Sequence, residues 1–188
     1  MELYLVALYA HFIAVVATVA ASSILHFNFM RMRRAATVSA AGDAVATIAR
    51  VAPFMPLFAL ALFASGAWLV QMRWTWHDGW IVAGIVGLVS ILLVSLIVQK
   101  PRLVAVGRML REAKDGSLDS TMAAAIADRV TWGVLHFNHV MALAIMFVMV
   151  TKPSLGVSLT VLLLAPAAGV WSALSRPSLR SSPVRAHE

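Results

Sequence analysis

The chain has 188 residues, a mean hydropathy of +0.87 and a hydrophobic content of 61%. Because an ordinary soluble domain is about 45–50% apolar, this composition excludes a typical soluble globular fold. The sequence contains no cysteine, which excludes disulfides, thiolate metal sites and iron–sulfur clusters. The formal net charge is +7.

The hydrophobic residues gather in five runs of about 20 residues, the length of helix that crosses a hydrocarbon core of ~30 Å. The runs are Leu3–Leu25, Pro53–Met72, Trp80–Val98, Val130–Val150 and Leu155–Leu174. Backbone groups in lipid must hydrogen-bond within their own segment, so each run is predicted to be a helix. The sequence therefore predicts an all-α, polytopic membrane bundle as a single domain over residues 1–175. Residues 176–188 are expected to form a basic, disordered tail.

The basic residues orient this predicted bundle, because cytoplasmic loops of membrane proteins carry an excess of Lys and Arg. One side holds Arg31, Arg33, Arg34, Arg50, Lys100, Arg102, Arg108, Arg111, Lys114, Arg129, Arg176, Arg180 and Arg185. The other side holds only Arg73 and Lys152. We therefore expect the N-terminus outside and the C-terminus in the cytoplasm of a bacterial inner membrane. The nearest partner of these charges is anionic lipid rather than nucleic acid.

The two long loops on the basic side are expected to contain short helices. Gly42–Asp43 can end one turn and cap a helix over residues 44–51. Pro101 can open an amphipathic helix over residues 102–114. Asp119 or Ser120 can cap a further helix that continues into the fourth span. These loops are either a docking surface for a protein partner or plain extensions of the membrane helices.

Histidines are the candidates for chemistry, because all 8 acidic residues lie outside the predicted spans. This absence of intramembrane carboxylates argues against a proton-coupled transporter. His11, His136 and His139 lie inside spans, and an ionisable residue there suggests function. His136 and His139 share one face of the fourth span, since residues three apart are neighbours on a helix. Asn138 points elsewhere and can hydrogen-bond an adjacent helix.

Depth in the membrane suggests which histidines can meet. Counted from the outer end of each span at 1.5 Å per residue, His11 lies about 12 Å deep, His139 about 17 Å and His136 about 21 Å. His26 lies about 35 Å deep on the same scale and is not expected to join them. The sequence therefore predicts that His11 and His139 face one another, with His136 as a substitute.

Two imidazoles on facing helices are typical axial ligands of a b-type haem, and they also suit copper. Met146, two turns beyond His139 on the same side, can add a thioether ligand for copper. The predicted cofactor ligands are His11, His139 and His136, and the predicted metal ligands are His11, His139 and Met146. The alternative is a non-catalytic scaffold or accessory subunit, monomeric or oligomeric, whose histidines only form hydrogen bonds across helices.

The pattern of spans over residues 1–155 resembles the copper-resistance D-like superfamily, in particular its uncharacterised bacterial integral-membrane proteins. The likeness rests on His11 in the first span, Gly66–Trp68 in the second, Pro101–Arg102 after the third and Met149–Pro153 at the end of the fourth. The superfamily also resembles the HemJ-type protoporphyrinogen oxidases, whose first-helix histidine is associated with haem. The resemblance thus implies a haem- or copper-handling membrane protein in which His11 is a ligand.

Overall fold

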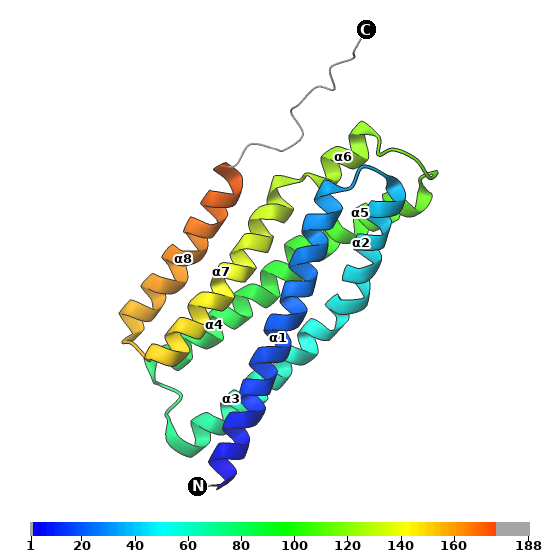
Figure 1. Cartoon of the computed structure of the whole chain (residues 1–188). Helices are drawn as coiled ribbons and strands as arrows, with labels where there is room; N and C mark the ends of the chain where they lie inside the picture. Colours follow the sequence, from blue (N-terminus) through cyan, green and yellow to red (C-terminus); the bar gives the residue numbers. More distant parts are fainter. Residues whose placement is uncertain (1, 176–188) are drawn as a thin grey trace.

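Five long, apolar rods make up the part of the chain that the computed structural model describes, residues 2–175 (Figure 1). The rods are α1 (Glu2–Arg34); α2 (Val38–Val51) with the 3-10 turn η1 (Ala52–Phe54) and α3 (Met55–Arg73); α4 (Gly79–Val94) with the π-helical turn η2 (Ser95–Gln99) and α5 (Lys100–Glu112); α6 (Ser120–Ile126) with α7 (Arg129–Thr151); and α8 (Leu155–Ser175). Each rod contains a stretch long and apolar enough to cross a membrane, as expected for a multi-pass membrane protein.

The first four rods are longer than a membrane requires. The first three contain 33, 36 and 34 residues, which corresponds to about 50 Å each at 1.5 Å per residue, whereas α7 alone, after the break at Asp128, has 23 residues or about 35 Å. The hydrocarbon core is only about 30 Å thick. Part of each of these long helical segments therefore lies outside the hydrocarbon. Figure 1 shows that their ends lie at different levels along the bundle.

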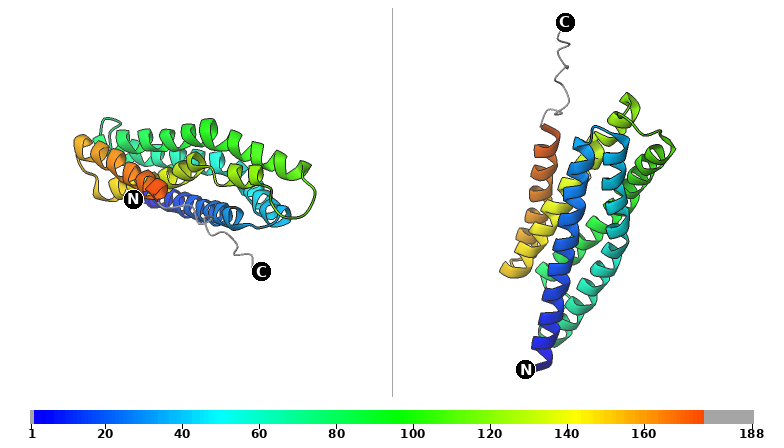
Figure 2. Two further views of the ribbon diagram at one scale, coloured as in Figure 1. Left: turned by 90° about the horizontal axis from the view of Figure 1, so that it is seen from above. Right: turned by 45° about the vertical axis from the view of Figure 1, so that its right-hand side comes forward.

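The helices form two groups that are staggered along the bundle axis. Helix α1 packs against α2 and α3, whereas α7 packs against α8 and α4. In Figures 1 and 2, the N-terminal part of α1 and the end of α3 extend well beyond the neighbouring ends of α7 and α8. Residues at the same count from a span end are therefore not at the same height in the two groups.

A compact apolar core joins the two groups at one end of the bundle. We call this the basic end, because Arg31, Arg34, Arg108 and Arg129 lie there on α1, α5 and α7. The core includes Phe29, Met32, Ala41, Ala44, Ile48, Val106, Leu110, Ile126 and Leu135. Two connecting loops are also pinned together there, since Val38 N donates to Gly116 O at 2.9 Å and Leu118 N to Ala36 O at 3.2 Å. The basic end is thus packed like the core of a soluble domain.

The five predicted spans are confirmed as helices, but the first one ends later than predicted. Helix α1 runs on to Arg34 instead of ending near Leu25. Phe29 and Met32 lie in the core of the basic end, and the buried Asn28 donates from Nδ2 to Ile24 O at 2.9 Å. Burial of these side chains extends the helix beyond the uninterrupted apolar run. The tail predicted over residues 176–188 lies outside the described residues.

Helices occur in both long loops, with different boundaries. Gly42–Asp43 does not end a turn, because α2 begins at Val38 with Thr37 Oγ1 accepting from Ala40 N at 3.2 Å. Asp119 caps α6 as predicted, accepting from Met122 N at 2.8 Å. That helix does not continue into α7, since Asp128 starts a new cap by accepting from Thr131 N at 3.0 Å. Pro101 lies at the start of α5, which follows α4 through η2 without a break.

The second group is packed through glycines on α4. A Cβ placed on Gly79 would lie 2.6 Å from the backbone nitrogen of Leu155, and one on Gly87 would lie 2.8 Å from Cγ1 of Ile145. Ala83 is fully buried in the same interface. The Ala83–x–x–x–Gly87 face therefore brings α4 close to α7, as small residues do in membrane bundles.

We predict that Gly79→Ala destabilises the protein by about 1–3 kcal/mol, because its methyl group would overlap the backbone of Leu155. Gly42→Ala is the matched control, since a Cβ there meets nothing within 4 Å and alanine favours a helix interior by about 1 kcal/mol. The measurement is the thermal unfolding midpoint of each variant in detergent. Equal midpoints for the two variants would contradict the close approach of α4 and α8.

Candidate functional site

His11, the first predicted ligand, joins α1 to α3. Its Nδ1 lies 3.0 Å from Ser65 Oγ. The Ser65 hydroxyl donates its own proton to Ala61 O at 2.6 Å, so the imidazole N–H of His11 is the donor. Gly66 lies beside the ring, since a Cβ there would be in ordinary van der Waals contact with Cε1 of His11 at 3.4 Å. This contact holds two helices of the first group together.

His139 meets His26, and not His11. The ring centroids of His26 and His139 are 4.4 Å apart at an interplanar angle of 60°. His136, one turn away on α7, has its ring centroid 6.0 Å from that of His26. The predicted pairing of His11 with His139 is therefore wrong, and so is the exclusion of His26. His11 lies fifteen residues before His26 on the same helix, which is about 22 Å away.

The stagger of the two helix groups explains this difference. The depths predicted from the sequence assume that Leu3 and Val150 lie at the same level. In the structure, α1 extends past the end of α7 (Figure 1), so a residue far along α1 reaches the middle part of α7. His26, His136 and His139 together form a cluster between α1 and α7, which we call the histidine cluster.

Hydrogen bonds define the protonation of two of these rings. Nδ1 of His136 lies 3.0 Å from Trp132 O, and Nδ1 of His139 lies 3.2 Å from Leu135 O. A carbonyl oxygen only accepts, so each Nδ1 carries a hydrogen. In the neutral imidazole, Nε2 then keeps its lone pair. Both rings are thus oriented by a backbone carbonyl in the way that metal-bound histidines usually are.

His26 contributes the unusual polar atom of the cluster. Its Nδ1 is buried and has no hydrogen-bond partner among the described residues. A buried polar nitrogen without a partner costs about 1–3 kcal/mol. This atom lies on a ring next to those of His136 and His139, so a bound ion, proton or water shared by the three rings would remove that cost.

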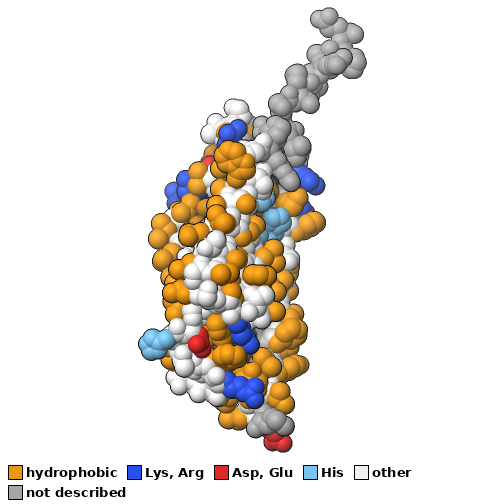
Figure 3. Space-filling view, turned by 90° about the vertical axis from the view of Figure 1, so that its left-hand side faces the viewer, with side chains coloured by type: hydrophobic (Ala, Val, Ile, Leu, Met, Phe, Trp, Pro, Cys, Tyr) orange, Lys and Arg blue, Asp and Glu red, His pale blue; other side chains and the backbone are white. Residues whose placement is uncertain are grey.

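The cluster continues toward the basic end through aromatic contacts. The Trp132 ring lies 5.4 Å from that of His136, and the guanidinium carbon of Arg33 lies 4.4 Å above Trp132. The flank drawn in Figure 3 is covered mainly by hydrophobic side chains. His26, His136 and His139 are each only partly buried. The Arg33 guanidinium therefore stacks beside the cluster on its basic side, and the three histidines are partly accessible.

No finished metal centre is present in the described part of the chain. Residues 2–175 contain no group of three or more His, Cys, Asp or Glu side chains placed to hold a metal ion. Met146, the predicted thioether ligand, is 41% exposed and lies about 10 Å beyond His139 along α7. The structure thus does not place Met146 with the histidine cluster. Whether the histidines bind a cofactor stays a prediction.

Asn138 faces the opposite side of α7, where it forms the hydrogen bonds predicted for it with an adjacent helix. Its Nδ2 donates to Ser95 Oγ at 2.9 Å and to Gln99 Oε1 at 3.3 Å. Both partners belong to η2, the π-helical turn between α4 and α5. These bonds hold α7 to η2 while its histidines face α1.

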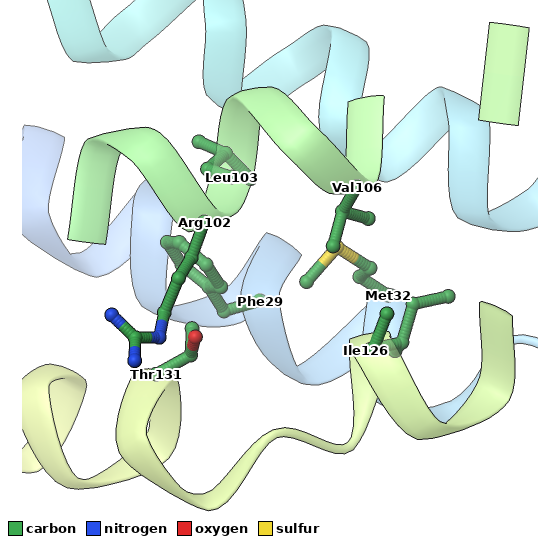
Figure 4. A pocket seen from close by; sticks show the side chains of 8 residues that line it. Phe29, Met32, Arg102, Leu103, Val106, Ile126 and Thr131 are labelled. Atoms are coloured by element: carbon green, nitrogen blue, oxygen red, sulfur yellow. The ribbon is translucent and has the colours of Figure 1, made fainter. Parts of the chain in front are cut away.

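A small cavity lies at the basic end, between α1, α5, α6 and α7 (Figure 4). Phe29, Arg102 and Thr131 are among the side chains around it. Its volume of about 10 Å³ leaves room for at most one water molecule. The cavity does not adjoin the histidine cluster and is too small for an organic cofactor.

Comparisons with known proteins give no match. No protein-family model matches the chain, and no curated protein or solved structure matches it significantly. The functional argument therefore depends on the residues and geometry described above.

Proposed function

We propose that this chain is a multi-pass membrane protein that binds a copper ion at His26, His136 and His139. The single observation that carries the proposal is the convergence of three imidazoles from two membrane helices, at ring distances of 4.4 and 6.0 Å from His26. Imidazole is a good ligand for copper, zinc and iron. A role in copper handling also agrees with the resemblance of the sequence to the copper-resistance D-like superfamily.

The charge of the site favours a monovalent ion. Three neutral imidazoles supply no negative charge, and Asp128 at the start of α7 is already bonded to Thr131 and Arg102. The cost of removing an ion from water rises steeply with its charge, and a buried charge needs compensation. Cu(I) carries half the charge of Zn(II) and accepts a small number of nitrogen ligands. The cluster therefore suits Cu(I) better than Zn(II).

A copper ion also fits the cluster better than haem b does. With metal–nitrogen bonds of about 2 Å, two axial imidazoles would have ring centroids about 6 Å apart. The distance between His26 and His136 is close to this value, but the His139 ring lies 4.4 Å from that of His26. At 4.4 Å the rings of His26 and His139 are too close for a porphyrin between them. A single ion would require the three rings to turn toward one another, since residues 2–175 contain no ready-made group of three metal-binding side chains.

We place the basic end in the cytoplasm of a bacterial inner membrane, with the N-terminus outside. The support is the charge distribution, because Arg73 and Lys152 are the basic residues of the opposite end, whereas those of α2, α5 and the end of α1 lie at the basic end. We predict that a fluorescent protein fused to the C-terminus folds and emits, and that a phosphatase fused there stays inactive. The reverse activities would overturn this orientation.

Copper binding is tested by loading the purified protein with Cu(I) under reducing conditions and measuring bound metal after desalting. We predict about one copper per chain. Bound copper raises the thermal unfolding midpoint, because a ligand at 100 times its Kd stabilises by about 2.7 kcal/mol. His26→Ala and His139→Ala should each abolish both effects. His11→Ala is the matched control, since it removes a histidine of the same helix that bonds to Ser65, and it should keep the copper.

Other outcomes separate the alternatives. A Soret band in the absorption spectrum of the purified protein that is lost in His26→Ala would show that the bound cofactor is haem and not copper. If no metal is bound after loading and copper does not raise the unfolding midpoint, the histidines serve only in structural hydrogen bonds. The chain would then be a scaffold or accessory subunit. Copper retained by His26→Ala but lost from His11→Ala would contradict the site itself.

A further inference from the structure

A line of unpaired basic residues runs along one face of α5. Lys100, Arg108 and Arg111 lie within about 80° of one another around the helix, at 100° per residue. All three side chains are exposed. The salt bridge found in residues 2–175 joins Arg102 to Asp128 at 3.1 Å, so these three residues have no carboxylate partner there. We call Lys100, Arg108 and Arg111 the α5 stripe.

Packing of the opposite face of α5 keeps the α5 stripe on the exposed side of the helix. Val106 and Leu110 on the opposite side of α5 are buried in the core of the basic end. A Cβ on Gly107 would lie 3.3 Å from Cγ1 of Val45, which shows how closely α5 approaches α2. Arg102 is the one arginine of α5 that the ion pair with Asp128 occupies. The remaining charges are therefore exposed, on a helix that lies beside α2 (Figure 1).

The position of the stripe points to lipid headgroups. Helix α5 continues directly from the apolar α4 and η2, so Lys100 lies at the edge of the hydrocarbon and Arg111 about 16 Å further out. The headgroup layer adds about 5–7 Å on each side of the hydrocarbon, and the field of an anionic membrane extends about 8–10 Å beyond its surface, so the backbone of Arg111 lies near the limit of this field. Long basic side chains bend toward the headgroups. Val104, within the stripe, is 50% exposed. An apolar side chain among the charges suits a lipid interface better than nucleic acid.

We infer that the α5 stripe binds the phosphate groups of anionic phospholipids in the membrane that contains the protein. A juxtamembrane Lys or Arg contributes about a five-fold gain in affinity for an anionic membrane. Two arginines of the stripe together account for about 25-fold on the same basis. This inference does not depend on the copper site, because the stripe and the histidine cluster share no residue.

The test uses the detergent-solubilised full chain and counts bound lipids by native mass spectrometry. Phosphatidylglycerol is titrated against phosphatidylcholine, with inorganic phosphate in a parallel series. We expect preferential binding of phosphatidylglycerol that weakens with salt, about five-fold loss in Arg108→Gln and about 25-fold loss in Arg108→Gln/Arg111→Gln. Arg102→Gln is the control, since it removes the same charge from another face of the same helix and should keep the preference.

Three results would overturn the inference. Equal binding of the two lipids would remove the role of the headgroup charge. An equal loss in Arg102→Gln would show that total charge matters and that the stripe does not. Competition by inorganic phosphate at the same concentration as the lipid would point to a site for free phosphate. Size-exclusion profiles and thermal midpoints of all variants show whether any loss reflects misfolding.

Discussion

The register of α1 against α7 is the constraint on which the rest of the structure depends. It is fixed at the basic end, where Phe29 and Met32 enter the shared core and the guanidinium of Arg33 lies 4.4 Å above Trp132. Once this end is fixed, the helical rise of 1.5 Å per residue determines how far each residue of α1 and α7 lies from the basic end. His26 therefore contacts His136 and His139, whereas His11 lies further along α1 and hydrogen-bonds to Ser65 on α3.

This register also places His11 and His26 in different surroundings. His11 has a complete hydrogen bond to a neighbouring helix, which is the ordinary use of a polar residue between membrane helices. His26 has a buried nitrogen without a partner in the described chain, next to two rings whose Nε2 lone pairs are free. The unsatisfied atom belongs to a ring whose centroid lies 4.4 and 6.0 Å from those of the other two rings. A bound ion would satisfy all of them at once, which is why the proposed function rests on this cluster.

The sequence predicted the number and type of the helices, because apolar length and backbone satisfaction in lipid leave few alternatives. It also predicted Asp119 as a helix cap and Asn138 as a polar contact. It could not give the stagger, since charges mark the ends of a span but not the height of one helix relative to another. His26 was missed for this reason. Phe29 and Met32, apolar residues between His26 and Arg34, were the signal that α1 continues.

The most direct test of this account is a distance measurement between nitroxide labels, for which the absence of cysteine provides a clean background. Cysteines are introduced in pairs at positions 26 and 139, and at positions 11 and 139, and the labelled protein is measured by electron paramagnetic resonance in lipid. The account predicts strong dipolar broadening for the first pair. For the second pair it predicts a separation of about 20 Å or more, from the helical rise between His11 and His26. Broadening for the second pair and none for the first would contradict it.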